Sequence, residues 1–283
     1  MEISIICPTY NNIKYLKLFV DSIKNNSFYD HELIFHINDG SDGSLDFVKE
    51  KKIKFTHSMH NIGLCSAVNE AFSHSTKKYI LYAHDDMYFC KNWDKILEQE
   101  VSKYSNKLFY LSGTNVSYID GLINYDCGNS HDNFDKNKFD NFCINDTSED
   151  LQGSHWAPHL IHRDLWIKVG GFSDEFNPGD GSDPDLCFKL WNENVRIFKC
   201  LSKFKVYHFG SITTRKSSIQ KNNGTKKFLL KWGFNPRFFR KYYLRGEGKA
   251  LFNGPLKDPN RDINMILSLF INRLKFFYHK LFT

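Results

Sequence analysis

The 283-residue sequence lacks the signatures of several common protein classes. Its seven cysteines include no pair at Cys-x-x-Cys spacing, and their number is odd. This pattern argues against a zinc site or a disulfide framework and favours reduced thiols in a cytosol. No apolar run is long enough to span a bilayer. A strand is predicted to begin within the first two residues, so we expect no signal peptide.

Two nucleotide-binding signatures are also missing. The first predicted strand is not followed by G-x-G-x-x-G, which argues against a dinucleotide-binding fingerprint. The pattern G-x-x-x-x-G-K-[ST] is absent, which argues against a Walker-type ATPase. The composition is that of a globular protein, with 41% hydrophobic and 25% charged residues. The net charge of +6 suits anionic substrates or a membrane surface as well as nucleic acid.

Strands and helices alternate through the first half of the chain. Apolar residues at helical spacing separate short apolar runs, which predict strands at 2–7, 32–38, 53–57 and 79–83. Such alternation predicts an α/β fold with a parallel sheet.

The predicted elements are less regular beyond residue 108. The dipeptide Asp120-Gly121 lies between short apolar runs and predicts a hairpin over 116–125. Residues 128–150 are rich in Asn, Asp and Ser and predict a long surface loop. Further runs predict a short helix at 164–169 and strands at 159–162, 195–199 and 205–209.

Polar residues follow the fourth predicted strand directly, as His84, Asp85 and Asp86. Ligands of open α/β sheets bind at the carboxyl ends of strands. Two adjacent acids there are suited to hold a divalent cation and, through it, the phosphates of a substrate. The alternative is an acidic turn that caps the next helix. Asp39 lies in a similar place after the second strand, where it either shapes an Asp-Gly turn or accepts hydrogen bonds from a base or ribose.

The C-terminal part of the sequence is basic and rich in aromatic residues. Arg215 and Lys216 follow His208 closely, which favours neutralisation of a diphosphate over ordinary solvated charge. Residues 263–282 predict an amphipathic helix with a basic polar face. Its apolar stripe suits docking on the core or contact with a membrane surface, and both alternatives stay open.

Six short motifs together resemble the catalytic domain of glycosyltransferase family 2, the inverting enzymes with a GT-A fold. They are SIICPTYN at 4–11, NDGS at 38–41, NIG at 61–63 with Ala67 and Asn69, HDD at 84–86, VGGF at 169–172 with Asp174 and Glu175, and SDPDL at 182–186. Each motif is short, but six in the family's order make a specific signal that covers about residues 2–215.

The resemblance implies a fold and a domain organisation. The expected GT-A fold has a single Rossmann-like, mostly parallel central sheet flanked by helices. We expect the catalytic domain to span residues 1–215, and a basic, aromatic-rich helical extension to span 216–283.

The resemblance also implies roles for individual residues. The residues expected to bind the nucleotide are Pro8, Thr9, Tyr10, Asp39, Asn61, Gly63, His84 and Asp85. Asp86 and His208 are the expected ligands of a divalent cation, Mn²⁺ or Mg²⁺. His84 replaces the first Asp of the family's D-x-D motif. Arg215 and Lys216 are expected to contact the diphosphate.

Asp183 is the expected catalytic base. An acceptor hydroxyl is a poor nucleophile, so a carboxylate must take its proton as it attacks the anomeric carbon. The local pattern also predicts that Asp183 is an N-cap with Pro184 at the first helical position, and the two roles are compatible. Asp185 is the nearest rival and is expected near the sugars. His155 and Trp156 are expected to contact a sugar as an aromatic platform, with a packing anchor as the alternative for the tryptophan.

The expected activity is that of a metal-dependent inverting hexosyltransferase in surface polysaccharide biosynthesis. Its donor would be a UDP-, GDP- or dTDP-linked sugar, and its acceptor a glycan or lipid-linked glycan. We expect no nucleic-acid partner and a cytoplasmic location, at the inner face of a membrane if residues 263–283 contact one. The alternatives are a nucleotidyltransferase acting on sugar phosphates and a non-catalytic carbohydrate-binding protein.

Overall fold

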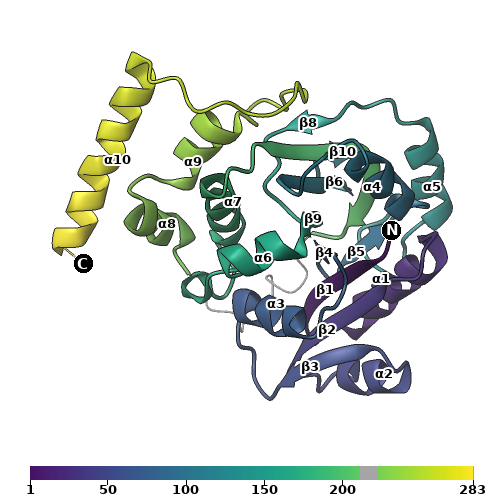
Figure 1. Ribbon diagram of the computed structural model, residues 1–283. Coiled ribbons are helices and arrows are strands. Elements are labelled where there is room, and N and C mark those ends of the chain that lie inside the picture. The colour runs from purple at the N-terminus through teal and green to yellow at the C-terminus, as the bar shows by residue number, and fades with distance from the viewer. Residues whose placement is uncertain (211–221, 283) are drawn as a thin grey trace.

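The computed structural model describes residues 1–210 and 222–282, and a ten-stranded sheet with helices on both sides forms its centre (Figure 1). Its first four strands are parallel and lie in the order β3-β2-β1-β4. They are β1 (Ile3–Tyr10), β2 (Glu32–Asn38), β3 (Lys54–Ser58) and β4 (Tyr79–Tyr82). The connecting helices are α1 (Ile13–Asn26), α2 (Ser44–Glu50) and α3 (Leu64–Ser73). The parallel α/β arrangement predicted for this half is confirmed.

The second half of the sheet is mixed. Its strands continue the order as β9-β6-β10-β5, with β9 antiparallel to β4 and β6. The last strand, β5, is antiparallel to the end of β10. These strands are β5 (Met87–Phe89), β6 (Phe109–Ser117), β9 (His159–His162) and β10 (Ile197–His208), with the short β7 (Ile123–Asn124) and β8 (Leu151–Gln152) beside them.

Nine helical segments of the described chain follow β5. The α-helices are α4 (Trp93–Val101), α5 (Lys136–Asn145), α6 (Arg163–Val169), α7 (Ser182–Asn192), α8 (Gly224–Trp232), α9 (Pro236–Phe239) and α10 (Ile263–Phe282). Two short segments of other types are the 3₁₀-helix η1 (Asp174–Phe176) and the π-helical η2 (Arg240–Leu244). None of the helices among the described residues is long and apolar enough to cross a membrane.

Aromatic side chains attach the segment from α8 to η2 to helix α7. Phe188 of α7 packs edge-on against the rings of Trp232, Phe234, Phe239 and Tyr243, with ring centroids 4.9–5.6 Å apart. Such pairs combine burial of large apolar surfaces with a favourable ring geometry. The segment from α8 to η2 therefore shares a hydrophobic core with α7.

Three local predictions were wrong. Residues 116–125 form no hairpin, because β7 pairs with β6 in parallel, with Val116 opposite Ile123. The chain makes a full loop between them, which the Tyr125 amide closes by donating to the Ser117 carbonyl at 2.8 Å. Residues 128–150 are not all loop, since Asp135 caps α5 and Phe139 anchors it in the core.

The two strands predicted at 195–199 and 205–209 are one strand, β10. Its pairing with β6 shifts between Leu201 and Lys205, so that the residues between them bulge from the ladder. Ser202 and Lys203 interrupt the apolar pattern there, which is why the sequence predicted a break. The bulge bends β10 but leaves its last residues paired with β5.

The start of α3 is joined to the loop that precedes α7. The Asn177 side-chain oxygen accepts a hydrogen bond from the Cys65 amide at 2.9 Å, and the Pro178 carbonyl accepts one from the Leu64 amide at 3.2 Å. Asn177 thus satisfies a backbone donor at a helix N-terminus. A Cβ on Gly63 would lie 2.4 Å from the Asn177 side chain, and Gly63 has a φ of +87°. Only glycine fits both conditions.

We expect Gly63→Ala to destabilise the protein more than Gly170→Ala, by at least about 1 kcal/mol. Gly170 also has a positive φ, +71°, but a Cβ there would meet nothing within 4 Å. Urea unfolding of the two variants measures the difference. Equal losses would show that the approach of Asn177 does not require glycine at position 63.

Candidate active site

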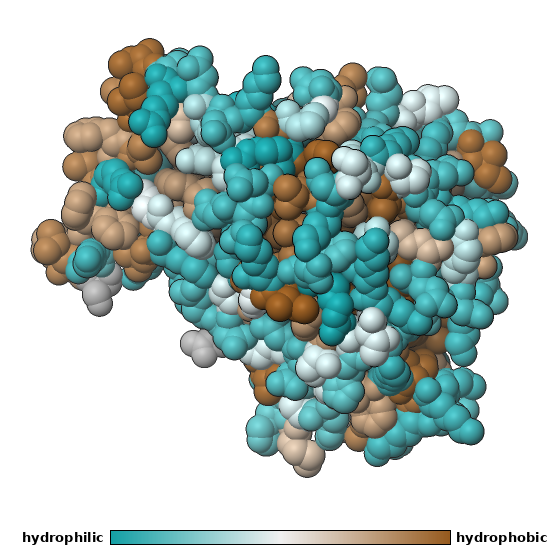
Figure 2. Space-filling view, in the orientation of Figure 1, coloured by the Kyte–Doolittle hydropathy of each residue, from teal (hydrophilic) through white to brown (hydrophobic). Residues whose placement is uncertain are grey.

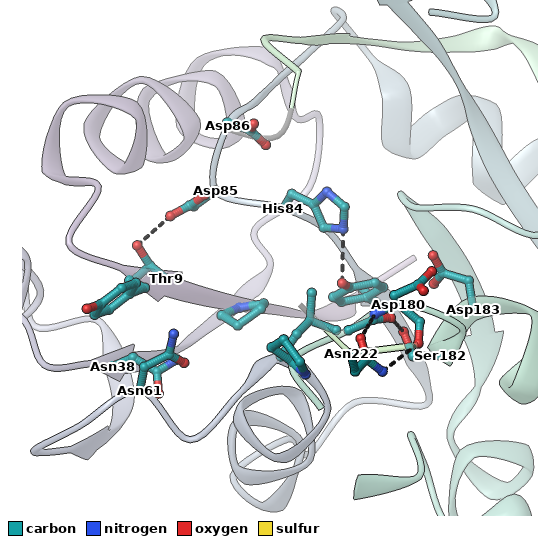
Figure 3. A pocket seen from close by; sticks show the side chains of 16 residues that line it. Thr9, Asn38, Asn61, His84, Asp85, Asp86, Asp180, Ser182, Asp183 and Asn222 are labelled. Carbon is teal, nitrogen blue, oxygen red and sulfur yellow. Dashed lines mark hydrogen bonds between the residues drawn. The ribbon is translucent and has the colours of Figure 1, made fainter. Parts of the chain in front are cut away.

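A cavity of about 380 Å³ opens at the carboxyl ends of β1 and β4 (Figure 3). Strand ends, the start of α3 and the loop before α7 all contribute to its walls. It is lined by Pro8, Thr9, Tyr10, Asn38, Asn61, Leu64, Tyr82, His84, Asp85, Asp86, Pro178, Gly179, Asp180, Ser182, Asp183 and Asn222. Its position is the one where open α/β sheets bind ligands.

The turn after β4 is fixed by Asp85. This buried carboxylate accepts hydrogen bonds from the Thr9 hydroxyl at 2.5 Å and from the Asn12 amide at 3.1 Å. In Figure 3 the Asp85 side chain points to Thr9, away from its neighbours His84 and Asp86. The three consecutive polar residues therefore have different surroundings.

His84, Asp86 and His208 form a cluster whose ligand atoms all lie within 4.8 Å of one another. The antiparallel pairing of β5 with β10 places His208 opposite Met87, beside Asp86. As a result the His208 Nε2 atom lies 3.2 Å from a carboxylate oxygen of Asp86. The sequence predicted Asp86 and His208 as metal ligands but assigned His84 to the nucleotide.

The donor atoms of this cluster fit a divalent cation. Burial, together with the nearby His208, lowers the pKa of His84 to about 4, so its imidazole is neutral at pH 7 and keeps a lone pair. Two imidazoles and one carboxylate suit a transition-metal ion better than Mg²⁺, which prefers oxygen ligands. His84 is oriented by a 3.0 Å hydrogen bond to the Tyr82 hydroxyl.

Asp183 stands in the first turn of α7. The prediction that it caps this helix was wrong, because the helix begins at Ser182 and its N-cap is Gly181, with a φ of +89°. Glycine alone takes that conformation without strain, so the helix starts two residues earlier than Pro184 suggested.

The Asp183 side chain is left available for chemistry. Its Oδ1 atom is buried and has no hydrogen-bond partner within residues 1–210 and 222–282. Burial raises the pKa of this carboxyl from 3.8 to about 7. A carboxyl with that pKa can take up a proton near neutral pH, as a general base requires.

A second cavity, of about 530 Å³, lies on the other side of Asp183. Asp183, Gly179 and Asp180 border both cavities. The remaining wall comes from the β8–β9 loop and from α7 to η2, and consists of His155, Trp156, Gly181, Pro184, Thr225, Asn235, Pro236, Arg237 and Arg240. The Asp183 carboxylate thus stands between two spaces that could each hold one substrate.

His155 and Trp156 line the second cavity, as expected of residues that contact a sugar. The Trp156 indole donates to the Gly113 carbonyl at 3.1 Å, so it is a packing anchor as well as a wall. The His155 ring contacts the Gly153 carbonyl at 3.1 Å through Nδ1.

Some predicted site residues lie elsewhere. Asp185 was expected near the sugars, but it lies on the buried face of α7 that packs against α8. There it accepts a hydrogen bond from the Trp232 indole at 2.8 Å and pairs with Lys231 at 2.9 Å. Its helical position turns it away from both cavities. Arg215 and Lys216 lie outside the described residues.

Asp39 and Gly63 are near the first cavity without lining it. The Asp39 side chain accepts from Ser41 and Asn11, which lowers the pKa of its carboxyl, and its own φ is +63°. Its neighbour Asn38 lines the cavity instead. Gly63 acts through the contact with Asn177 described above.

Several lining residues were missed by sequence reasoning. Tyr82 was read as an ordinary strand residue, and Asp180 and Ser182 as parts of a loop. Arg237 and Arg240 were noted only within a basic segment. The H-x-D spacing of His84 and Asp86 was a usable signal for a shared metal site, but the third member depended on strand pairing.

Known proteins resemble this chain in sequence and in fold. The model of glycosyl transferase family 2 matches residues 4–157. An uncharacterized glycosyltransferase of Rickettsia bellii is 31% identical over 124 residues, which are 42% of this chain and 17% of that protein.

Among solved structures, S. aureus TarS 1–349 has a TM-score of 0.55 at 15% identity, covering 74% of this chain and 60% of that one. GalNAc-T7 with UDP, GalNAc and Mn²⁺ has a TM-score of 0.58 at 13% identity, covering 81% and 47%. The chain spans less than two thirds of the length of each of these relatives.

The two solved structures are GT-A glycosyltransferases, so the predicted fold class is confirmed. The family model covers more than half of the chain and includes the segments that end at Thr9, Asn38 and Asp86. The protein belongs to glycosyl transferase family 2.

Proposed function

We propose that the protein is a metal-dependent, inverting hexosyltransferase. It moves a sugar from a nucleoside-diphosphate sugar to a hydroxyl of a glycan or glycoconjugate acceptor, in the synthesis of a surface polysaccharide. One observation carries the proposal. The Asp183 carboxylate lies on the wall shared by the two cavities. The first of these cavities is also lined by His84 and Asp86, two members of the group that could hold a metal ion.

The first cavity is the proposed donor site. TarS has been solved with UDP and with UDP-GlcNAc, and GalNAc-T7 with UDP. We therefore favour a UDP-linked donor over a GDP- or dTDP-linked one. In this proposal Pro8, Thr9, Tyr10 and Asn61 contact the nucleoside, and Asp39 accepts a hydrogen bond from its base. Arg215 and Lys216 remain the proposed partners of the diphosphate.

His84, Asp86 and His208 are the proposed cation ligands. A divalent cation, when bound, stabilises the negative charge of the leaving diphosphate. The fold holds these ligands in place. Asp85 fixes the turn after β4, which carries His84 and Asp86, and the pairing of β10 with β5 fixes His208. The two imidazoles favour Mn²⁺ over Mg²⁺, and Mn²⁺ is the cation present in GalNAc-T7.

Asp183 is the proposed general base. It accepts the proton of the acceptor hydroxyl while that oxygen attacks the anomeric carbon from the second cavity. The diphosphate leaves on the opposite side, into the first cavity. A single displacement of this kind, with no covalent intermediate, inverts the anomeric configuration.

Residues 216–283 are the proposed extension of a catalytic domain at 1–215, and the boundary itself lies outside the described residues. Seven unpaired cysteines support a reducing compartment such as the cytoplasm. We propose that α10 places the enzyme at the inner face of a membrane.

The exposed face of α10 supports membrane contact. Each of its ten exposed apolar side chains has more than half of its surface exposed: Ile263, Ile266, Leu267, Phe270, Ile271, Leu274, Phe277, Tyr278, Leu281 and Phe282. Figure 1 shows the helix at the edge of the molecule, and the brown surface at the left of Figure 2 belongs to this part. Only Met265 and Asn272 are buried, so the helix docks through its other side. Exposed Arg273, Lys275 and Lys280 complement anionic lipids.

We expect Asp86→Asn to lose at least about a hundredfold in turnover, because it removes the only carboxylate of the cluster. It should also lose the increase in melting temperature that UDP and Mn²⁺ together give the wild type. Asp30→Asn, at an exposed position away from the cavity, serves as the control. Near-normal turnover of Asp86→Asn in EDTA-treated buffer would contradict the metal assignment.

We expect Asp183→Asn to lose about 10²–10⁴ in turnover while keeping UDP affinity, because the amide cannot accept the proton. In the wild type, turnover should rise with pH up to about 7, since the base must be unprotonated. Stability should change in the opposite direction. The folded state holds this proton more tightly than the unfolded chain, so stability falls as pH rises from about 4 to 7. Asp183→Asn should lack that loss.

Asp185→Asn is the matched control for this experiment. It lies on the same helix but should lower the melting temperature rather than turnover, because it weakens a buried network with Lys231 and Trp232. An inactive Asp185→Asn together with a fully active Asp183→Asn would mean that the base is assigned to the wrong carboxylate.

We expect the double variant Phe270→Glu, Phe277→Glu to sediment less with vesicles containing phosphatidylserine, without a change in melting temperature. Both side chains are more than half exposed, so the charges should not disturb the fold. Met59→Glu, at an exposed apolar position outside α10, is the control. Unchanged vesicle binding would refute the membrane role, and dissociation of an oligomer would assign the stripe to a second copy of the chain.

A further inference from the structure

We propose that the second cavity selects an acceptor that carries an anionic group, a phosphate or carboxylate, and that Arg237 and Arg240 bind this group. The inference rests on the proposed function, because it takes the second cavity as the acceptor site. It adds a chemical class for the acceptor, which the family assignment leaves open.

A rigid platform presents the two arginines. Asn235 caps α9 by accepting a hydrogen bond from the Phe238 amide at 2.9 Å, and Pro236 follows at the start of the helix. Phe238 and Phe239 are buried in the aromatic cluster next to α7. The backbone that carries both guanidinium groups is therefore fixed by capping and by core packing, which favours a preformed binding site.

Neither guanidinium is used to hold the fold together. Within the described ranges 1–210 and 222–282, the guanidinium groups of Arg237 and Arg240 make no hydrogen bond or ion pair, and only the backbones of these residues are hydrogen-bonded. Arg196, in contrast, pairs with Asp258 at 3.0 Å, and Arg245 donates to the Lys257 carbonyl at 2.8 Å. A planar guanidinium matches phosphate and carboxylate oxygens with two parallel hydrogen bonds. Two such groups on one cavity wall are suited to an anion.

Charge is distributed unevenly along the cavity. Its acids, Asp180 and Asp183, are shared with the donor cavity and so mark that end. Arg237 also borders a neighbouring groove next to α10, which is lined by Lys241, Lys275 and one acid, Asp262, and so marks the opposite end. An acceptor bound along this direction would have its hydroxyl at Asp183 and its negative group at the arginines.

His155 does not add to the positive charge of the cavity. Burial lowers the pKa of its imidazole to about 4, and the nearby Arg240 acts in the same direction. The ring is therefore neutral at pH 7, and the arginines are the cationic groups of this wall. Together with Trp156, whose ring lies at 71° to it, it offers aromatic surface for a sugar ring beside the anion-binding end.

The cavity is large enough for the proposed ligand. About 530 Å³ can hold a sugar with one phosphate. The same phosphate chemistry could come from a soluble sugar phosphate or from a lipid-linked sugar that reaches the cavity past α10. The experiment has to separate these two sources.

Isothermal titration calorimetry of the full chain, with UDP and Mn²⁺ at saturation to fill the donor site, tests the proposal. The probes are glucose 6-phosphate, glucose and geranyl phosphate. We expect at least one phosphate probe to bind at least tenfold more tightly than glucose. A preference for glucose 6-phosphate indicates a soluble acceptor, and a preference for geranyl phosphate a lipid-linked one.

We expect Arg237→Ala and Arg240→Ala each to weaken phosphate binding about tenfold or more, because each removes charge-assisted hydrogen bonds. UDP affinity should not change. Arg261→Ala, at an exposed arginine outside the cavity, is the matched control. Phosphate binding that is absent from the wild type, unaffected by both variants or equally lost in Arg261→Ala would overturn the proposal. Failure of the wild type to bind UDP would instead count against the proposed function.

Discussion

The geometry of the site depends on one buried carboxylate, Asp85. A charged group at 4% exposure is stable only when its oxygens are hydrogen-bonded, and Thr9 and Asn12 supply these bonds. They tie the turn after β4 to the end of β1. The residues on either side of Asp85 are thereby turned elsewhere, and His84 and Asp86 come to face His208. Asp85 thus shapes the site by fixing the conformation of the turn that carries His84 and Asp86.

A second link sets the place of Asp183. The loop before α7 is held at the start of α3, where Asn177 caps the helix and Gly63 makes room for it. This attachment brings Asp183 over the first cavity and buries its Oδ1 atom without a hydrogen-bond partner among the described residues. The cost of burying that charge is what raises its pKa into the range useful for a base. The packing of this loop against α3 therefore also accounts for the raised pKa of Asp183.

Features that depend on a local residue pattern could be predicted from the sequence. The parallel strands, the polar residues at their ends and the order of six motifs could be predicted because each lies within a few consecutive residues. The closeness of His84 to both Asp86 and His208 could not, since it depends on a pairing of β5 with β10 across more than a hundred residues. The cap of α7 was misassigned because Pro184 suggested a later start than Gly181 permits. Asp185 shares a motif with Asp183, but the helical turn sends the two side chains in different directions.

The C-terminal extension is part of the site as well as an addition to the fold. Thr225 of α8, Arg237 of α9 and Arg240 of η2 complete the cavity that Asp183 faces. The aromatic cluster around Phe188 holds these elements against α7, the helix that carries the proposed base. A chain truncated before α8 would therefore lose much of the wall of the second cavity. Thr225, Arg237 and Arg240 lie outside residues 4–157, the part that the family model matches, whereas Thr9, Asn38 and Asp86 of the first cavity lie inside it. If the second cavity is the acceptor site, as proposed, its chemistry is therefore set largely by a part of the chain that the family model does not describe.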